Sequence, residues 1–168
     1  KTILVSILAG VPMQKLAGMS GQKKVIRMMP NLGLSVGHGM AVWKSMGLTK
    51  PETARAKTFI NKITDNFEVK NEDAINKATA ISGSGPAYFF LLAESMLTAA
   101  KSFGFSAEES RKLVNKTFRA AAALSESGDY SEMIKKIASK GGTTEAALKI
   151  FKSKNFAKIV DQAMHAAY

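Results

Sequence analysis

The sequence predicts an α/β segment followed by an all-α segment, and three observations carry this fold class. Continuous apolar runs typical of buried strands occur only in the first 70 residues. Helix-start signals separate these runs, which is the pattern of a doubly wound sheet of which only part is present. From residue 71 onward, apolar residues recur at helical spacing and no further strand is expected.

Strands and helices are expected to alternate in the first segment. Four strands are predicted, over residues 3–8, 23–31, 37–45 and 66–70. The first two read as strands of a parallel sheet that is covered on both faces, whereas the third reads as an edge strand. A short helix is expected over 11–18, and Thr49 and Glu52 have capping-box spacing, which predicts a helix over 49–63.

Helices alone are expected in the second segment, over residues 71–82, 82–104, 106–127, 131–139, 143–153 and 156–168. Ser106 and Glu109 again have capping-box spacing. The stretch from Tyr88 to Ala93 is apolar on every side, and such a helix must be buried all round. This predicts a second subunit. Glu94, which interrupts the apolar stretch, is either a paired structural carboxylate or a site residue.

Composition narrows the class of protein. Of 168 residues, 46% are hydrophobic, so a packed core is expected. Cysteine is absent and the two histidines lie far apart, so neither a disulfide framework nor a metal centre is expected. The apolar run at 3–8 is too short for a membrane span or a secretion signal, which favours a cytoplasmic protein without membrane contact. The net charge of +11 fits a phosphorylated cofactor, a nucleic acid or simply a solvated basic face.

Two strand ends are candidates for a ligand crevice. Ala9 and Gly10 follow the first strand, while Met29, Pro30 and Asn31 end the second. Ligands of open α/β sheets bind outside the carboxyl ends of strands, so these residues are expected to line a crevice edge. The alternative is that both are ordinary strand-ending turns.

Two glycine-rich helix entrances are further candidates. "SGSGPAY" precedes the apolar helix and is either a ligand turn or a tight helix–helix contact. In "SKGGTT", Gly141 and Gly142 allow a close backbone approach, and Thr143 and Thr144 place hydroxyls beside free N–H groups. This second entrance is either a small-anion site or a flexible connector.

Together these motifs resemble the pyrroline-5-carboxylate reductase family. The matching segments are Ser6–Gly10, Arg27–Asn31, Ala80–Tyr88 and Ser139–Thr144, in order and at compatible spacing. Three departures are visible. Leu32 and Gly33 follow the "MPN" motif where Thr and Pro are usual, His38 stands where Glu is common, and Lys140 replaces a frequent Pro.

The resemblance implies NADPH- or NADH-dependent reduction of 1-pyrroline-5-carboxylate to L-proline. Residues 1–70 are then the C-terminal portion of a Rossmann-like dinucleotide-binding domain, and residues 71–168 a helical dimerisation and substrate-binding domain. A homodimer, or a higher homo-oligomer built from dimers, is implied as well.

The resemblance also assigns site residues. Those implied to bind the cofactor are Ala9, Gly10, Met29, Pro30 and Asn31. Those implied to bind the substrate are Ser84, Tyr88, Ser139, Gly141, Gly142, Thr143 and Thr144. Because an imine accepts hydride best when it is protonated, Thr144, together with water, is the expected catalytic residue on the proton path.

The family's G-x-G-x-x-G turn, which cradles the pyrophosphate, is not found in these 168 residues. The "GSG" at 83–85 is no substitute, since it precedes an apolar helix and follows no strand. We therefore expect the chain by itself to be dimeric but inactive, with an exposed first strand. Two other classes compete: a helical dimerisation module without activity of its own, and a nucleic-acid-binding domain. The latter is disfavoured because no groove-reading motif is present.

Overall fold

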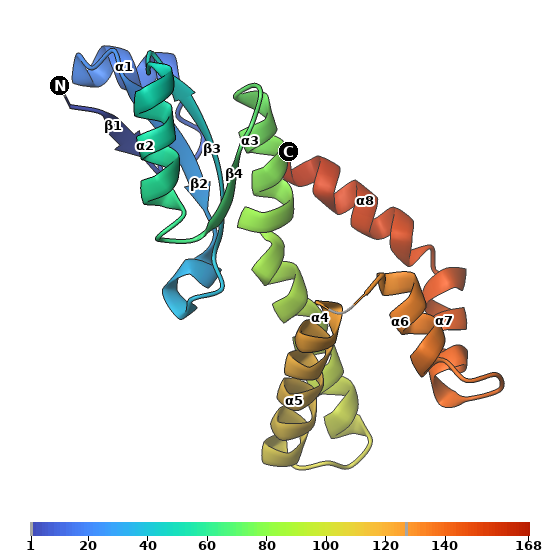
Figure 1. Cartoon of the computed structure of the whole chain (residues 1–168). Coiled ribbons are helices and arrows are strands. Elements are labelled where there is room, and N and C mark those ends of the chain that lie inside the picture. Colours follow the sequence, from blue (N-terminus) through green and yellow to red (C-terminus); the bar gives the residue numbers. More distant parts are fainter. Residues whose placement is uncertain (1, 127) are drawn as a thin grey trace. The chain divides into compact units, whose positions relative to one another are not determined.

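The computed structural model describes residues 2–126 and 128–168, which form two compact units (Figure 1). The first unit extends to Pro86 and also includes Met164–Tyr168, and the second is Ala87–Ala163. The first unit holds a four-stranded sheet with three helices, and the second is helical throughout. The predicted combination of an α/β part and an all-α part is confirmed.

The sheet has the order β1-β2-β3-β4 and is mixed. Its strands are β1 (Leu4–Ser6), β2 (Val25–Pro30), β3 (Met40–Met46) and β4 (Asp65–Glu68). The pairs β1–β2 and β3–β4 are parallel, and the central pair β2–β3 is antiparallel. The nine residues 31–39 between β2 and β3 form only a 3₁₀ turn, η1 (Leu32–Val36), which is too short for a parallel crossover.

The prediction that the third strand is an edge strand is therefore wrong. β3 lies inside the sheet, and Trp43 at its middle is fully buried. The two edges are formed by β1 and β4, and β1 is the exposed first strand that the sequence predicts. Val5, Ile7 and Leu8 on and after β1 are about half exposed (47%, 58% and 54%).

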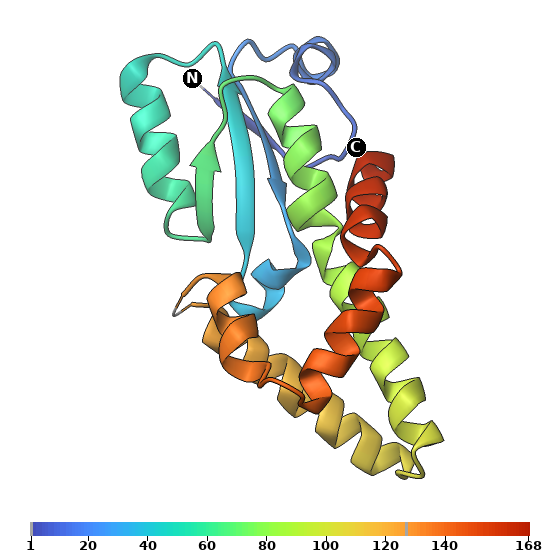
Figure 2. The same ribbon diagram turned by 90° about the vertical axis from the view of Figure 1, so that its right-hand side faces the viewer.

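Helices cover both faces of the sheet (Figure 2). They are α1 (Met13–Ser20), α2 (Lys50–Ile60) and α3 (Asp73–Ala78). Successive side chains of β2 point to opposite faces. Ile26 and Met28 pack in the cluster that includes α2, whereas Val25 packs against α1 and Met29 against α3. α2 thus covers one face, and α1 and α3 share the other.

The predicted capping box of α2 is confirmed. Glu52 accepts hydrogen bonds from the N–H and hydroxyl of Thr49, both 2.9 Å, and from the ammonium of Lys24. The Lys24 hydrogen bond, followed by the two from Thr49, lowers the pKa of the Glu52 carboxyl to about 2. This side chain therefore fixes both the start of α2 and its position beside β2.

α3 continues into a π-helical turn (Thr79–Gly83), which leads to the long helix α4 (Gly85–Ser102). The other helices of the second unit are α5 (Ala107–Ser125), α6 (Tyr130–Ile137), α7 (Thr143–Ser153) and α8 (Phe156–Ala167). The capping box predicted at Ser106 and Glu109 is present at the start of α5. The predicted helices of this region are all found.

The apolar helix α4 is not covered within one chain. Phe89, Phe90 and Leu91 are 58%, 58% and 65% exposed. Phe89 makes an edge-to-face contact with Phe118 of α5, at 6.0 Å between ring centroids, but most of its neighbours on α4 lack such a cover. The burial on all sides that the sequence demands is absent from the single chain.

Candidate functional site

The carboxyl ends of β1 and β2 lie at one edge of the sheet. The two strands are parallel, with Ser6 opposite Arg27, so the segments that follow them leave on the same side. Ala9 and Gly10 are exposed there, and Met29 and Pro30 are half-buried. Gly10 has a φ of 70°, a backbone conformation that glycine adopts without strain. The structure thus brings the two predicted cofactor segments to one edge.

Asn31 closes the connection between β2 and β3. Its backbone N–H donates to the carbonyl of Met40 (3.0 Å), and its side-chain Oδ1 accepts from the N–H of Met40 (3.1 Å). A Cβ on Gly33 would lie 2.5 Å from the carbonyl oxygen of His38, so no side chain fits there. The unusual Gly33 after "MPN" therefore has a steric reason, whereas Leu32 beside it is 69% exposed.

Arg27 is a buried cation at the centre of the first unit, only 4% exposed. Its Nη1 donates to Oε1 of Glu72 and its Nη2 to Oδ1 of Asn76, both at 2.9 Å. The same Oε1 of Glu72 accepts a hydrogen bond from the N–H of Met13 (2.8 Å). Glu72 and Asn76 were not expected from the sequence. The signal that could have found them is an arginine in an apolar strand, which needs a buried partner.

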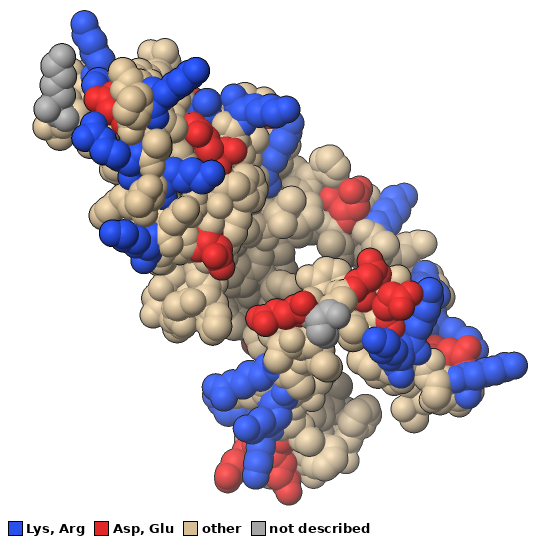
Figure 3. All heavy atoms as spheres, in the orientation of Figure 1, with Lys and Arg blue, Asp and Glu red and all other residues tan. Residues whose placement is uncertain are grey.

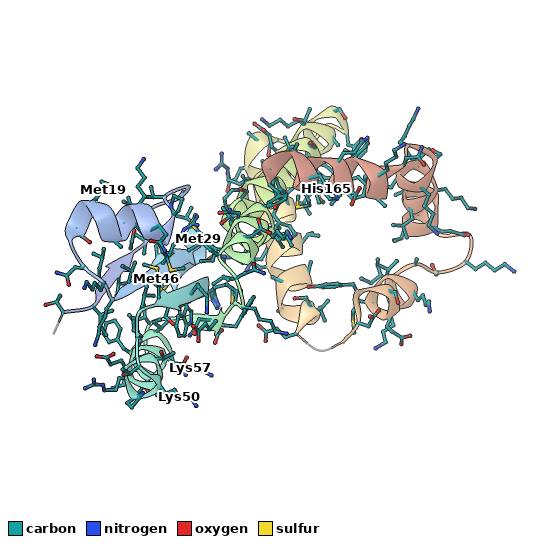
Figure 4. The ribbon with its side chains drawn as sticks, turned by 90° about the horizontal axis from the view of Figure 1, so that it is seen from above. Met19, Met29, Met46, Lys50, Lys57 and His165 are labelled. Carbon is teal, nitrogen blue, oxygen red and sulfur yellow. The ribbon has the colours of Figure 1, made fainter. Side chains whose placement is uncertain are left out.

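The "SGSG" turn lies against the end of β2. A Cβ on Gly83 would meet Cγ2 of Thr79 at 3.1 Å and the terminal methyl of Met29 at 3.7 Å. Figure 4 shows Met29 beside α3, with which it packs. The N–H of Ser84 donates to the carbonyl of Thr79 (2.9 Å), which closes the π turn. Such turns are frequent at functional sites.

The "SKGGTT" segment forms the entrance of α7 in the second unit. Gly141 has a φ of 75°, and a Cβ on Gly142 would lie 2.5 Å from the hydroxyl of Ser139. The N–H of Gly142 donates to the carbonyl of Ser139 (3.0 Å). Gly141 is thus favoured by its backbone conformation, whereas a Cβ on Gly142 would lie close to both the hydroxyl and the carbonyl oxygen (3.1 Å) of Ser139.

The first turn of α7 presents unused donors. Within the described residues, the structure gives no acceptor to the backbone N–H groups of Thr143, Thr144 and Glu145. These groups carry the partial positive charge of the helix start. Thr143 is exposed and Thr144 half-buried. The arrangement suits a small carboxylate.

Glu145 is a candidate site residue that the sequence analysis missed. Its Oε2 accepts a 2.6 Å hydrogen bond from the N–H of Gly141, and its Oε1 lies 3.4 Å from the ammonium of Lys149. The signal was available, since a Glu at the third position of a helix is half of a capping box.

The predicted site residues are divided between the two units. Ala9, Gly10, Met29, Pro30, Asn31 and Ser84 belong to the first unit. Tyr88, Ser139, Gly141, Gly142, Thr143 and Thr144 belong to the second. Glu94 on α4 is exposed, and the structure shows no ion pair for it among the residues it describes.

Basic side chains are dispersed over the face seen in Figure 3, with acidic ones among them. Lys112, Lys116 and Arg119 line a hollow on α5 together with Asn115. Over residues 2–126 and 128–168, no helix has the length and apolar character needed to cross a membrane. Among the same residues, no group of three acidic or histidine side chains could hold a metal ion.

Sequence comparison finds relatives over nearly the whole chain. A family model described as pyrroline-5-carboxylate reductase dimerisation matches residues 72–168. The pyrroline-5-carboxylate reductase of Pseudomonas aeruginosa is 35% identical over 169 residues, which cover 98% of this chain and 62% of the relative. That of Haemophilus influenzae is 33% identical, with the same two coverages.

Solved structures agree with these relatives. The pyrroline-5-carboxylate reductase of Coxiella burnetii is 31% identical with a TM-score of 0.87, over 98% of this chain and 63% of that one. The Plasmodium falciparum enzyme with NADP bound is 31% identical with a TM-score of 0.86, over 98% and 68%. The chain spans about 62% of the length of the sequence relatives named above. Since the family model matches more than half of its residues, the chain belongs to the pyrroline-5-carboxylate reductase family.

Proposed function

We propose that this chain supplies the nicotinamide-side edge, the substrate-carboxylate site and the subunit interface of an enzyme that reduces 1-pyrroline-5-carboxylate to L-proline. The observation that carries the proposal is the entrance of α7, where unused N–H groups stand beside the hydroxyls of Thr143 and Thr144. Family membership and the NADP bound to the Plasmodium falciparum relative support it.

The entrance of α7 is suited to the substrate carboxylate. The N–H groups of Thr143, Thr144 and Glu145 are donors at the positive end of the helix dipole. Among residues 2–126 and 128–168, Glu145 is the acidic side chain in contact with the turn, and Lys149 lies beside it. Ser139, Gly141 and Gly142 shape the turn that presents these donors. Ser84 and Tyr88 are proposed as further substrate-binding residues.

The carboxyl-end edge of the sheet fits a nicotinamide. Ala9 and Gly10 are exposed, and nothing lies within 4 Å of the position that a Cβ on Gly10 would take, so a flat ring can approach the backbone. Met29 and Pro30 offer an apolar surface at the end of β2, and Asn31 fixes the turn that follows. A bound NADPH or NADH supplies the hydride for the imine carbon.

We assign Thr144 to the proton path to the imine nitrogen. Thr144 is half-buried in the first turn of α7, beside the N–H groups that would hold the carboxylate. A hydroxyl both donates and accepts, so Thr144 and a water molecule relay a proton to the nitrogen as the hydride arrives. Its role is to protonate and orient the imine.

The active form is a homodimer, or a larger homo-oligomer built from dimers. The exposed apolar side chains of α4 require cover, and the matched family model describes a dimerisation region. A second copy that presents the same α4 would provide this cover through a symmetric interface.

One competing function has its own support. The family model matches residues 72–168, which leaves out the sheet, so the chain is alternatively a helical dimerisation module without activity. The experiment compares the chain with a chimera, in which it is fused to the part of the Pseudomonas aeruginosa relative that the match leaves out. Oxidation of NADPH and NADH is followed by absorbance with 1-pyrroline-5-carboxylate added.

We expect no reduction by the chain alone and imine-dependent oxidation by the chimera. Light scattering and NADPH titration establish that the chimera is assembled and binds the cofactor. A chimera that is dimeric and binds NADPH but does not reduce the imine contradicts the proposed reductase and favours the dimerisation module.

A further inference from the structure

We propose that Glu72 and Arg27 form a positioning pair that sets the cofactor-side loop and the "SGSG" turn against the end of β2. This inference rests on the proposed function. The pair belongs to the first unit and touches neither the proposed substrate donors nor the glycine turns themselves. It acts through three elements that it holds together.

The alternation of β2 places Arg27 between two helices. Val25 packs with α1 and Met29 with α3, on the same face of the sheet. Arg27 lies between these two residues on that face. Its guanidinium therefore lies at the junction of α1, α3 and the sheet, and it is nearly inaccessible to water.

One carboxylate oxygen connects two elements to this guanidinium. Oε1 of Glu72 accepts from Nη1 of Arg27 (2.9 Å) and from the backbone N–H of Met13 (2.8 Å). Met13 is the first residue of α1, and Pro12 before it provides no side-chain cap. Glu72 thus caps α1 from another part of the chain. The capped end is also the exit of the loop that contains Ala9 and Gly10.

Both partners of Arg27 belong to the start of α3. Glu72 is the residue before α3, and Asn76 follows one turn later, where its Oδ1 accepts from Nη2 of Arg27 (2.9 Å). The planar guanidinium of Arg27 is bound at two points, Glu72 and Asn76, one turn apart. These two attachments fix the rotation of α3 about its axis. α3 leads directly into the π turn, which places Gly83 against the methyl of Met29.

The pair therefore positions three segments that are far apart in the sequence: the loop at residues 7–12, the end of β2 and the turn at residues 82–85. A charge-assisted pair between a buried arginine and a half-buried carboxylate suits this role because its hydrogen bonds are directional, whereas apolar packing would allow the segments to slide. Loss of the pair should loosen these segments before it loosens the opposite face of the sheet.

The first test uses the 168-residue chain and amide hydrogen exchange. The variants are Glu72→Ala, Glu72→Gln, which keeps an acceptor oxygen, and Asn76→Ala, which removes one bond of Arg27. The matched control is Asp73→Asn, on the next residue, whose carboxylate pairs with Lys77 (2.8 Å) and Tyr168 (2.6 Å) instead of Arg27.

In Glu72→Ala we expect exchange at Met13 and in the 82–85 turn to accelerate by about tenfold or more, the effect of one charge-assisted hydrogen bond. Exchange in α2, on the other face, should change little. Glu72→Gln should recover part of the protection, and Asp73→Asn should leave these amides unchanged. Equal acceleration in α2 and in the 82–85 turn would show a merely structural role and overturn the proposal. If Glu72→Ala does not fold, the proposal is tested by comparing exchange in α2 with exchange in the 82–85 turn for Glu72→Gln and Asn76→Ala.

The second test measures NADPH affinity and KM values in the active chimera. We expect Glu72→Ala to weaken NADPH binding by about tenfold, with Glu72→Gln intermediate and with a smaller change in KM for the imine. Unchanged NADPH affinity in a folded Glu72→Ala chimera contradicts the positioning role of the pair but leaves the proposed function untouched. An unmutated chimera that binds NADPH but reduces no imine contradicts the proposed function. In that case the hydrogen-exchange experiment still tests whether Glu72 and Arg27 position the three segments.

Discussion

Oε2 of Glu145 lies 2.6 Å from the backbone nitrogen of Gly141 and accepts its hydrogen bond. The carboxylate thus closes the left-handed turn of Gly141 onto the first turn of α7. It satisfies one N–H at the helix entrance and leaves those of Thr143, Thr144 and Glu145 for a ligand. A side chain that the sequence analysis passed over therefore decides which donors the turn offers.

Replacing Glu145 should loosen this turn. Glu145→Ala removes the acceptor of the Gly141 N–H, and the loss of such a cap costs about 1 kcal/mol of unfolding free energy. Urea unfolding measures the change. Glu132→Ala is the matched control, because Glu132 lies in the first turn of α6 and forms only a long, exposed pair with Lys135 (4.0 Å). Equal losses in both variants would show that the Gly141 bond contributes nothing of its own.

Thr144 should affect turnover more than cofactor binding. In the active chimera, Thr144→Ala removes the hydroxyl of the proposed proton path, and kcat should fall by about 10²-fold or more. NADPH affinity, measured by titration, should stay within about twofold, because Thr144 is assigned to substrate rather than to the nucleotide. Thr58→Ala on α2 removes a hydroxyl that only bonds the carbonyl of Ala54 and serves as the control. An unchanged kcat in Thr144→Ala removes this residue from the proton path.

The capping carboxylate of α2 predicts an acid-sensitive contribution to stability. The pKa of Glu52 is lowered from 4.5 to about 2, mainly by the hydrogen bond from Lys24 and then by Thr49. A group with a depressed pKa stabilises the fold fully above its unfolded value, and the contribution is lost as the pH falls from about 4.5 towards 2. Unfolding of the chain and of Glu52→Gln across this range measures it. The difference between them should shrink as the pH falls, and a constant difference would contradict the assignment.

The exposed face of α4 should govern assembly. Leu91, 65% exposed on α4, is expected to be buried against the second subunit, so Leu91→Glu places a charge in that interface. Light scattering should show a dimer for the parent chain and a monomer for the variant. Phe59→Glu makes the same change at a 61% exposed position on α2 and should remain dimeric. A dimer that survives Leu91→Glu would place the interface elsewhere.

Signals within a few residues of sequence predicted most of the helices and strands. The features that were mispredicted depend on contacts between residues far apart in the sequence. The helix starts at Thr49 and Ser106 were predictable because a capping box spans only four residues. The place of β3 was mispredicted, because an apolar run does not reveal which strands will lie beside it. The glycine turns were found as motifs, since their conformation is encoded locally.

Partners far apart in the sequence were harder to predict. Glu72 lies 45 residues from Arg27 and 59 from Met13, so no window of sequence contains the cluster. Likewise, the all-round apolar character of α4 predicted burial on every side, which the single chain does not provide, so burial against a second subunit stays a prediction. The sequence indicates that these apolar side chains need to be buried, but it does not indicate which molecule buries them.

The antiparallel return from β2 to β3 also bears on the order in which the sheet can assemble. These strands are joined by nine residues, so their pairing closes a short loop at little entropic cost. The parallel pairs on either side must wait for longer crossovers through α1 and α2. We expect the hairpin of β2 and β3 to form first and the outer strands to join it afterwards. On this pathway, Arg27 is in place on its strand before α3 brings Glu72 to meet it.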